Sequence, residues 1–208
     1  AVAAEVSYAR ALECAAGSAE LRALAAAADV PTLLTTLGDT DAVRRQGAAR
    51  LLAYTKVPAD QLLAALIACT DPEARRLGAP GLRTGLAGLE PAKLLPLGPA
   101  GLVAPLLAVH PTPFTAPEVR ATVVGWLTNE QSCADASLVI IARGTLADWG
   151  ETLVKALGAE ASAPAVVIAA HRSLEQLTRT QRSLDAYAGH RGDVQALAES
   201  LMADKRGA

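Results

Sequence analysis

Apolar residues recur along the chain at helical spacing, and proline or glycine interrupts them roughly every dozen residues. This alternation predicts a succession of short helices. Pro80-Gly81 falls inside one of them and is expected to kink or split it, because proline removes a hydrogen bond from the helix. The proline-rich stretch 89–117 is expected to form an irregular connection. The predicted helices span 2–16, 19–28, 32–37, 41–54, 59–68, 72–89, 101–109, 117–127, 134–142, 146–157, 164–177, 181–188 and 193–203.

Two of the predicted helices carry clear start signals. Asp71 stands in the N-cap position with Pro72 as the first helical residue, where a missing N–H costs nothing. Thr115 and Glu118 have the spacing of a capping box. Both signals predict helix starts close to residues 72 and 117.

Four segments align without gaps, beginning at Asp41, Pro72, Pro117 and Pro164. Each places a small or β-branched apolar residue eight positions before a leucine, with another midway between them. Such an internal repeat indicates stacked helical units. We expect the shared stripe to face the core, and its small residues to allow close helix contact. The stripe comprises Val43, Gly47, Leu51, Ala74, Gly78, Leu82, Val119, Val123, Leu127, Val166, Ala170 and Leu174.

An acidic turn residue followed by an apolar residue and an arginine stands at 39–44 (DTDAVR) and at 71–75 (DPEAR). These segments resemble the second helix of HEAT repeats. The resemblance implies an all-α, right-handed α-solenoid of about four HEAT-like repeats. As a single domain, it would have capping helices at 1–29 and 179–208 on either side of the repeats at 30–178.

The same resemblance implies a structural ladder, in which a turn aspartate caps the second helix and an arginine reaches a neighbouring repeat. The positions that match are Asp41, Arg44, Asp71, Arg75 and Arg120. The later repeats depart from the pattern, because Thr115 and Ser162 replace the aspartate and Val167 replaces the arginine.

Composition supports a folded helical chain. Hydrophobic residues make up 51% and charged residues 19% of the sequence, which excludes a disordered chain, and aromatic residues make up only 3%. The net charge of −2 argues against a chain held on nucleic acid by bulk charge.

No apolar run is long enough to predict a membrane span. Three widely spaced cysteines, Cys14, Cys69 and Cys133, fit buried reduced thiols and a cytoplasmic location.

Function in such repeats is expected on the face of the second helices that lies opposite the core stripe. The first half of this face is basic, which suggests an acidic partner. We therefore predict a non-catalytic scaffold or adaptor that binds a protein partner. The expected contact residues are Arg45, Leu52, Arg76, Arg83 and Arg172.

No catalytic motif occurs, and the three histidines lack the spacing of a helical metal pair, so neither metal nor cofactor is expected.

Two other functions stay open. Alkylpurine DNA glycosylases are similar in length and helix content; by that resemblance Trp126 with Glu130, or Asp148 beside Trp149, would form a repair site on nucleic acid. The third reading is a structural subunit of a larger assembly, whose oligomeric state the sequence leaves open.

Overall fold

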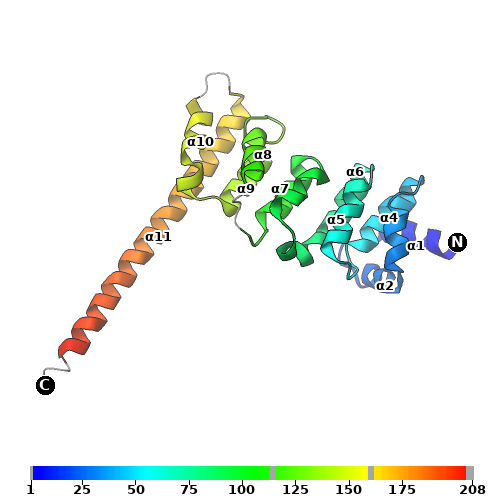
Figure 1. Cartoon of the computed structure of the whole chain (residues 1–208), viewed down its shortest axis with the longest axis horizontal. Helices are drawn as coiled ribbons and strands as arrows, with labels where there is room; N and C mark the ends of the chain where they lie inside the picture. The colour runs from blue at the N-terminus through cyan, green and yellow to red at the C-terminus, as the bar shows by residue number, and fades with distance from the viewer. Residues whose placement is uncertain (1, 113–115, 159–161, 205–208) are drawn as a thin grey trace. The chain divides into compact units, whose positions relative to one another are not determined.

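The computed structural model describes residues 2–112, 116–158 and 162–204, with side chains for 7–112, 116–158 and 162–185 (Figure 1). Every element in these ranges is helical and none is a strand, so the all-α prediction is confirmed. The α-helices are α1 (Val2–Glu13), α2 (Ala19–Ala27), α3 (Val30–Thr36), α4 (Ala42–Leu52), α5 (Ala59–Ala68), α6 (Pro72–Gly78), α7 (Ala100–Ala108), α8 (Pro117–Leu127), α9 (Cys133–Arg143), α10 (Leu146–Gly158) and α11 (Pro164–Asp204). Two 3₁₀-helices, η1 (Ala79–Gly88) and η2 (Pro91–Leu97), lie between α6 and α7.

The chain forms two compact units, residues 1–123 and 124–208, and the division falls inside α8. In the first unit α4 contacts α1, α2, α3 and α6, and it lies beside α6 in Figure 1. Also in this unit, α5 contacts α6, η1 and η2, and α7 contacts both η1 and η2. In the second unit α11 contacts α9 and α10. Most of these contacts join elements that are close in the sequence.

The starts of the repeated helices match the sequence pattern. Pro72, Pro117 and Pro164 are the first residues of α6, α8 and α11, as the alignment predicts. Thr115, the expected partner of Glu118 in a capping box, lies outside the described residues. Proline suits these positions because the first N–H groups of a helix have no partner within it.

The predicted kink at Pro80-Gly81 is confirmed as a change of helix type. The α-helix α6 ends at Gly78, and the 3₁₀-helix η1 continues from Ala79 to Gly88. Proline cannot donate to the i−4 carbonyl, so the chain passes into the tighter helix at this point. The stretch expected to be irregular contains η2 as well, which the sequence analysis did not predict.

The predicted core stripe is buried in all four repeated helices except at two positions. Val43 is 45% exposed and Leu174 is half-buried, whereas the other ten members are buried. Val43 lies in the first turn of α4, just after the N-cap Asp41. The recurrence of a buried stripe supports the alignment of the four segments.

Glycine in the stripe lets helices approach closely. A Cβ atom placed on Gly47 would lie 2.6 Å from Cβ of Tyr8, so α4 contacts α1 through its backbone at this point. A Cβ atom on Gly78 would lie 2.7 Å from the side chain of Leu66 on α5. The small residues therefore set the spacing between these helices.

The C-terminal part differs from the sequence prediction. Instead of three helices at 164–177, 181–188 and 193–203, one helix, α11, runs from Pro164 to Asp204. The hydroxyl groups of Thr178, Thr180 and Ser183 donate to carbonyls four residues earlier, so the polar stretch that suggested a break fits within the helix. The expected pair of C-terminal capping helices is thus a continuation of the helix before them.

We expect Gly47→Ala to lower the free energy of unfolding by about 1–3 kcal/mol, because its methyl group would push α1 and α4 apart. Gly88→Ala is the matched control, since a Cβ atom there meets nothing within 4 Å. The control should change stability by less than about 1 kcal/mol. Urea unfolding of both variants measures the difference; equal stability would show that the α1–α4 contact relaxes freely.

Candidate functional site

Asp71 joins α4 to α6 through both of its carboxylate oxygens. Its Oδ1 accepts hydrogen bonds from the backbone N–H groups of Glu73 (2.9 Å) and Ala74 (3.2 Å), which makes it the N-cap of α6. Its Oδ2 accepts hydrogen bonds from Arg45 (3.2 Å) and Gln46 (3.1 Å) of α4. One buried side chain therefore starts one helix and binds its neighbour.

The surroundings of Asp71 favour its charged form. Burial raises the pKa of the carboxyl. Hydrogen bonds to the carboxylate together lower this pKa by more than burial raises it; they come from the backbone N–H of Ala74, from Gln46, from the backbone N–H of Glu73 and from Arg45. The net pKa lies below the ordinary value for aspartate. Asp71 is consequently an ionised, fully hydrogen-bonded group at neutral pH.

Arg45 is the arginine that bridges the helices, in the role that the HEAT resemblance implied for Arg44. Besides Asp71, it donates to the backbone carbonyls of Asp39 (2.8 Å) and Thr40 (2.7 Å), and its side chain is only 19% exposed. Arg44 instead pairs with Asp39 at 3.1 Å, within its own turn. Arg45, expected on the open face, is therefore part of the internal packing.

Arg75 makes a second connection along the first unit. Its guanidinium donates to the carbonyls of Cys69 (2.6 Å) and Ile67 (3.2 Å) at the end of α5, and to the carbonyl of Leu97 (3.1 Å) at the end of η2. It thus ties three elements together through backbone oxygens.

The remaining ladder positions differ from one another. Asp41 is the N-cap of α4, where its carboxylate accepts a hydrogen bond of 2.7 Å from the N–H of Val43. Arg120 is exposed on α8.

The face opposite the core stripe is closed on α4 and open further along the chain. Leu52, expected to contact a partner, is completely buried, because α4 is packed against four other helices. On α6 and η1, by contrast, Arg76, Pro80 and Arg83 are all exposed. Arg76 pairs with Glu73 at 2.6 Å. The candidate binding surface in the first unit is therefore the α6–η1 face, without Arg45 and Leu52.

A concavity of about 480 Å³ lies beside this face. We call it the η1 groove; its lining residues are Arg83, Thr84, Leu86, Ala87, Val109 and Pro111. Val109, at the C-terminal end of α7, is 57% exposed. Arg83 makes no ion pair with any residue in the described part of the chain. The sequence pattern does not predict Val109 and Pro111 as part of this surface, because they are far from Arg83 in the sequence and lie outside the aligned segments.

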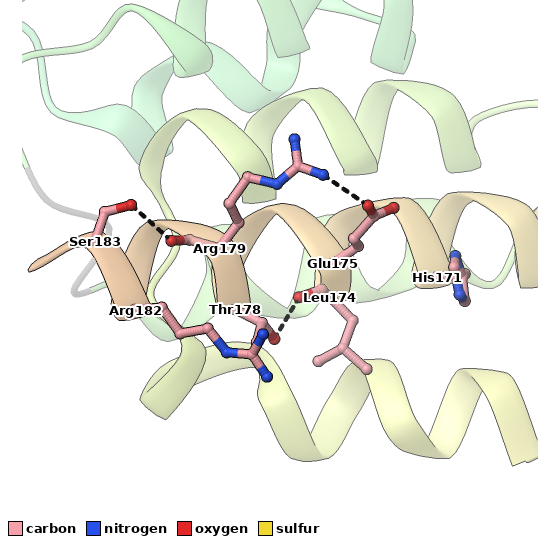
Figure 2. A pocket seen from close by; sticks show the side chains of 7 residues that line it. All are labelled: His171, Leu174, Glu175, Thr178, Arg179, Arg182 and Ser183. Carbon is pink, nitrogen blue, oxygen red and sulfur yellow. Dashed lines mark hydrogen bonds and ion pairs between the residues drawn. The ribbon is translucent and has the colours of Figure 1, made fainter. Parts of the chain in front are cut away.

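The second unit also leaves this face of its repeated helix open. Ile168 on α11 is 67% exposed, and Arg172 and Glu175 are exposed as well. Further along α11 lies a concavity of about 600 Å³, the α11 groove, lined by His171, Leu174, Glu175, Thr178, Arg179, Arg182 and Ser183 (Figure 2).

The residues considered for repair chemistry have other roles in the second unit. Trp149 is only 5% exposed, so its ring cannot stack on a base without unpacking. Thr145 donates its hydroxyl to the carboxylate of Asp148 at 2.6 Å, while the N–H of Asp148 donates to the same hydroxyl at 3.2 Å, so the two residues cap the start of α10 together. Trp126 is half-buried and Glu130 is exposed. These observations favour structural roles for Trp149 and Asp148.

His110 is a packing residue in the first unit. It is fully buried, its Nε2 lies 3.0 Å from the carbonyl of Leu89, and its Nδ1 accepts a hydrogen bond from the N–H of Thr112. Both ring nitrogens are thus engaged with the backbone. Among the described residues no cluster of three or more His, Cys, Asp or Glu side chains has the arrangement of a metal site.

No protein-family model, curated protein sequence or solved structure matches this chain. Within the described ranges, none of the helices combines the length and apolar character that crossing a bilayer requires.

We expect Asp71→Ala to lower the free energy of unfolding by about 2–4 kcal/mol, because it removes an N-cap and leaves Arg45 without its carboxylate. Asp29→Ala is the control, since Asp29 caps α3 but bonds only to Thr32 of that helix. The control should cost about 1 kcal/mol. Urea unfolding compares the two; an equal loss would contradict the bridging role.

Asp71 also predicts a pH dependence. Its pKa is lowered in the folded state, so its contribution to stability is present above the unfolded pKa of about 3.9 and is lost as the pH falls through the folded pKa. Asp71→Asn keeps a capping oxygen but removes the charge. The stability gap between wild type and this variant should hold from pH 7 to pH 5 and shrink below about pH 4. A gap that stays constant down to pH 2.5 would show that the charge contributes nothing.

Proposed function

We propose that this protein is a non-catalytic scaffold of HEAT-like repeats, which binds an acidic segment of a protein partner through the η1 groove. The proposed architecture is a right-handed α-solenoid of about four repeats. The observation that carries the proposed function is the combination of Arg83, without an ion pair in the described chain, and the exposed Val109 in one concavity.

The stacked-repeat part of the proposal rests on packing. The buried stripe recurs in α4, α6–η1, α8 and α11, and small residues within it allow backbone-level contact between helices. Asp71 and Arg75 link successive elements by charge-assisted hydrogen bonds. These features are those expected of repeats that bury their apolar faces against their neighbours.

The chemistry of the η1 groove favours an acidic and partly apolar segment. Arginine offers several donors in a fixed plane and binds carboxylates well, and exposed aliphatic surface gains free energy when it is covered. Arg76 lies on the same face, two turns before Arg83, but Glu73 already neutralises it. Arg83 is therefore the cation that a partner's carboxylate would meet.

Binding rather than catalysis fits the lining of the groove. Thr84 supplies a hydroxyl among the described lining residues, and that hydroxyl donates to the carbonyl of Gly81 at 3.2 Å. No carboxylate, histidine or cysteine is among the residues that line it. A nucleophile with an adjacent base, the minimum for covalent catalysis, is thus not assembled there.

A display library of random peptides provides the test. Peptides selected on the wild-type protein should be rich in Asp and Glu beside an aliphatic residue, and Arg83→Glu should weaken their binding by about tenfold or more. Arg22→Glu, which reverses an exposed arginine on α2, is the matched control and should bind as the wild type does. Selection of no acidic motif, or equal loss in both variants, would contradict the proposed groove.

Duplex DNA is the competing probe. Binding that falls steeply with salt concentration and is weakened by Arg83→Glu would move the assignment of this surface to nucleic acid. Under the proposal, DNA binding is weak and the Arg83→Glu and Arg22→Glu variants bind DNA alike.

A further inference from the structure

A mostly apolar cavity of about 340 Å³ lies among the first four helices of the first unit. We call it the α1–α4 cavity; its principal lining residues are Tyr8, Leu24, Asp29, Thr32, Leu33 and Leu51. The helices α1, α2 and α3 all contact α4, so α4 is the wall that the other three share. The volume falls within the range of small-molecule sites, about 300–1,000 Å³.

The cavity has a closed floor and an open mouth. Tyr8, Leu33 and Leu51 are at most 4% exposed, and they form an apolar interior. Asp29 and Thr32 are exposed, so the polar side chains lie at the mouth. A ligand therefore enters with its apolar part first and leaves its polar group beside Asp29. Covering the apolar interior gains free energy.

The Tyr8 wall is fixed at both ends. At its base, a Cβ atom on Gly47 would lie 2.6 Å from Cβ of Tyr8, so the residue is packed on the backbone of α4. At its tip, the Tyr8 hydroxyl lies 3.3 Å from the hydroxyl oxygen of Thr36. Thr36 already donates its only hydroxyl hydrogen to the carbonyl of Thr32 at 2.7 Å, so Tyr8 is the donor to Thr36. A wall held in this way costs little to order when a ligand binds.

The side chains of Tyr8, Asp29 and Thr32 can accept further hydrogen bonds but have no hydrogen left to donate. The N–H and the hydroxyl of Thr32 both donate to Oδ2 of Asp29, at 3.0 Å and 2.6 Å. These two bonds lower the pKa of Asp29 below its ordinary value, so the carboxylate is charged at neutral pH. Its Oδ1 has no hydrogen bond or ion pair within the described chain. The cavity thus offers a ligand lone pairs and a negative charge.

The end of α2 adds to the negative potential at the mouth. Ala27 is the last residue of α2 and Ala28 its C-cap, and both line the cavity. The last carbonyl groups of a helix lack partners within it and favour a cation nearby. The N-terminus of α3 has the opposite sign, but the N–H of Thr32 is already bonded to Asp29. Among the described residues that line the cavity, none is Lys, Arg or His.

We infer that the α1–α4 cavity binds a small primary amine with an apolar body. The body lies against Leu24, Leu33 and Leu51, and the ammonium group donates to Oδ1 of Asp29. A lysine side chain of another protein carries the same ammonium group, but it would bring the charge to the apolar floor first, which favours a free amine. The inference does not depend on the η1 groove, so Arg83→Glu should leave amine binding unchanged.

Three probes with one body test the polar group. Phenethylamine, phenethyl alcohol and hydrocinnamate share a phenyl ring on a two-carbon chain and end in a cation, a neutral hydroxyl and an anion. In calorimetric titration of the full chain, the amine should bind at least about tenfold more tightly than the alcohol, and the anion should not bind. A wild-type protein that binds no amine at millimolar concentration, or binds amine and alcohol alike, overturns the inference.

A fourth probe separates the two sources of an ammonium group. The methylamide of Nα-acetyl-lysine presents the lysine side chain between two peptide bonds, and it should bind more weakly than phenethylamine. Tighter binding of the lysine probe would overturn the assignment to a free amine and give the cavity to a partner's lysine.

Asp29→Asn tests the charge, because asparagine keeps an oxygen that caps α3. This variant should bind phenethylamine at least about tenfold more weakly and phenethyl alcohol within about twofold of the wild type. Asp41→Asn is the matched control: Asp41 is also an exposed N-cap, lies outside the cavity and should bind the amine as the wild type does. Amine binding that survives in Asp29→Asn, or an equal loss of amine and alcohol, contradicts the ion pair.

Filling the cavity tests the location. Ala27→Phe places a ring at the mouth and should abolish binding of both the amine and the alcohol. Ala26→Phe changes the preceding residue, which is exposed and does not line the cavity, and should bind both probes normally. Urea unfolding of the two variants shows that both are folded. Unchanged binding in Ala27→Phe would place the amine elsewhere and overturn the inference.

Discussion

The first unit depends on one constraint: the buried carboxylate of Asp71 must be fully hydrogen-bonded. A buried charge is costly unless it is paired, and Asp71 meets this requirement only when α6 begins at residue 72 and α4 presents Arg45 and Gln46 to it. The same bonds therefore fix where one helix starts and how its neighbour lies. Arg75 repeats the principle with backbone carbonyls as acceptors.

Close packing along the stripe has a consequence for function. Because Gly47 brings α4 against α1, and α2, α3 and α6 also contact α4, this helix is enclosed from Gly47 to Leu52, apart from the half-buried Arg50. The α6–η1 segment has fewer neighbours on its outer side, so Arg83 and the surface beside Val109 remain accessible. Differences in packing between the aligned helices thus decide which of them leaves this face exposed.

The η1 groove combines Arg83, which has no ion pair within the described chain, with the aliphatic surface of Val109. Under the proposed function, these two features are what an acidic, partly apolar segment would contact.

Local chemistry in the sequence determined the helical class and the starts of α6, α8 and α11. It also determined the change of helix type at Pro80 and most of the buried stripe. These features follow from the sequence because capping, proline geometry and the apolar period act within a few residues. Only the tertiary structure decided that Arg45 rather than Arg44 reaches Asp71, that Leu52 is enclosed and that Val109 lies beside Arg83. Neighbouring arginines have the same local pattern, and contacts between distant segments set their partners. The continuity of α11 was likewise missed, because hydroxyl side chains and glycines that usually mark a break can also be accommodated within a helix.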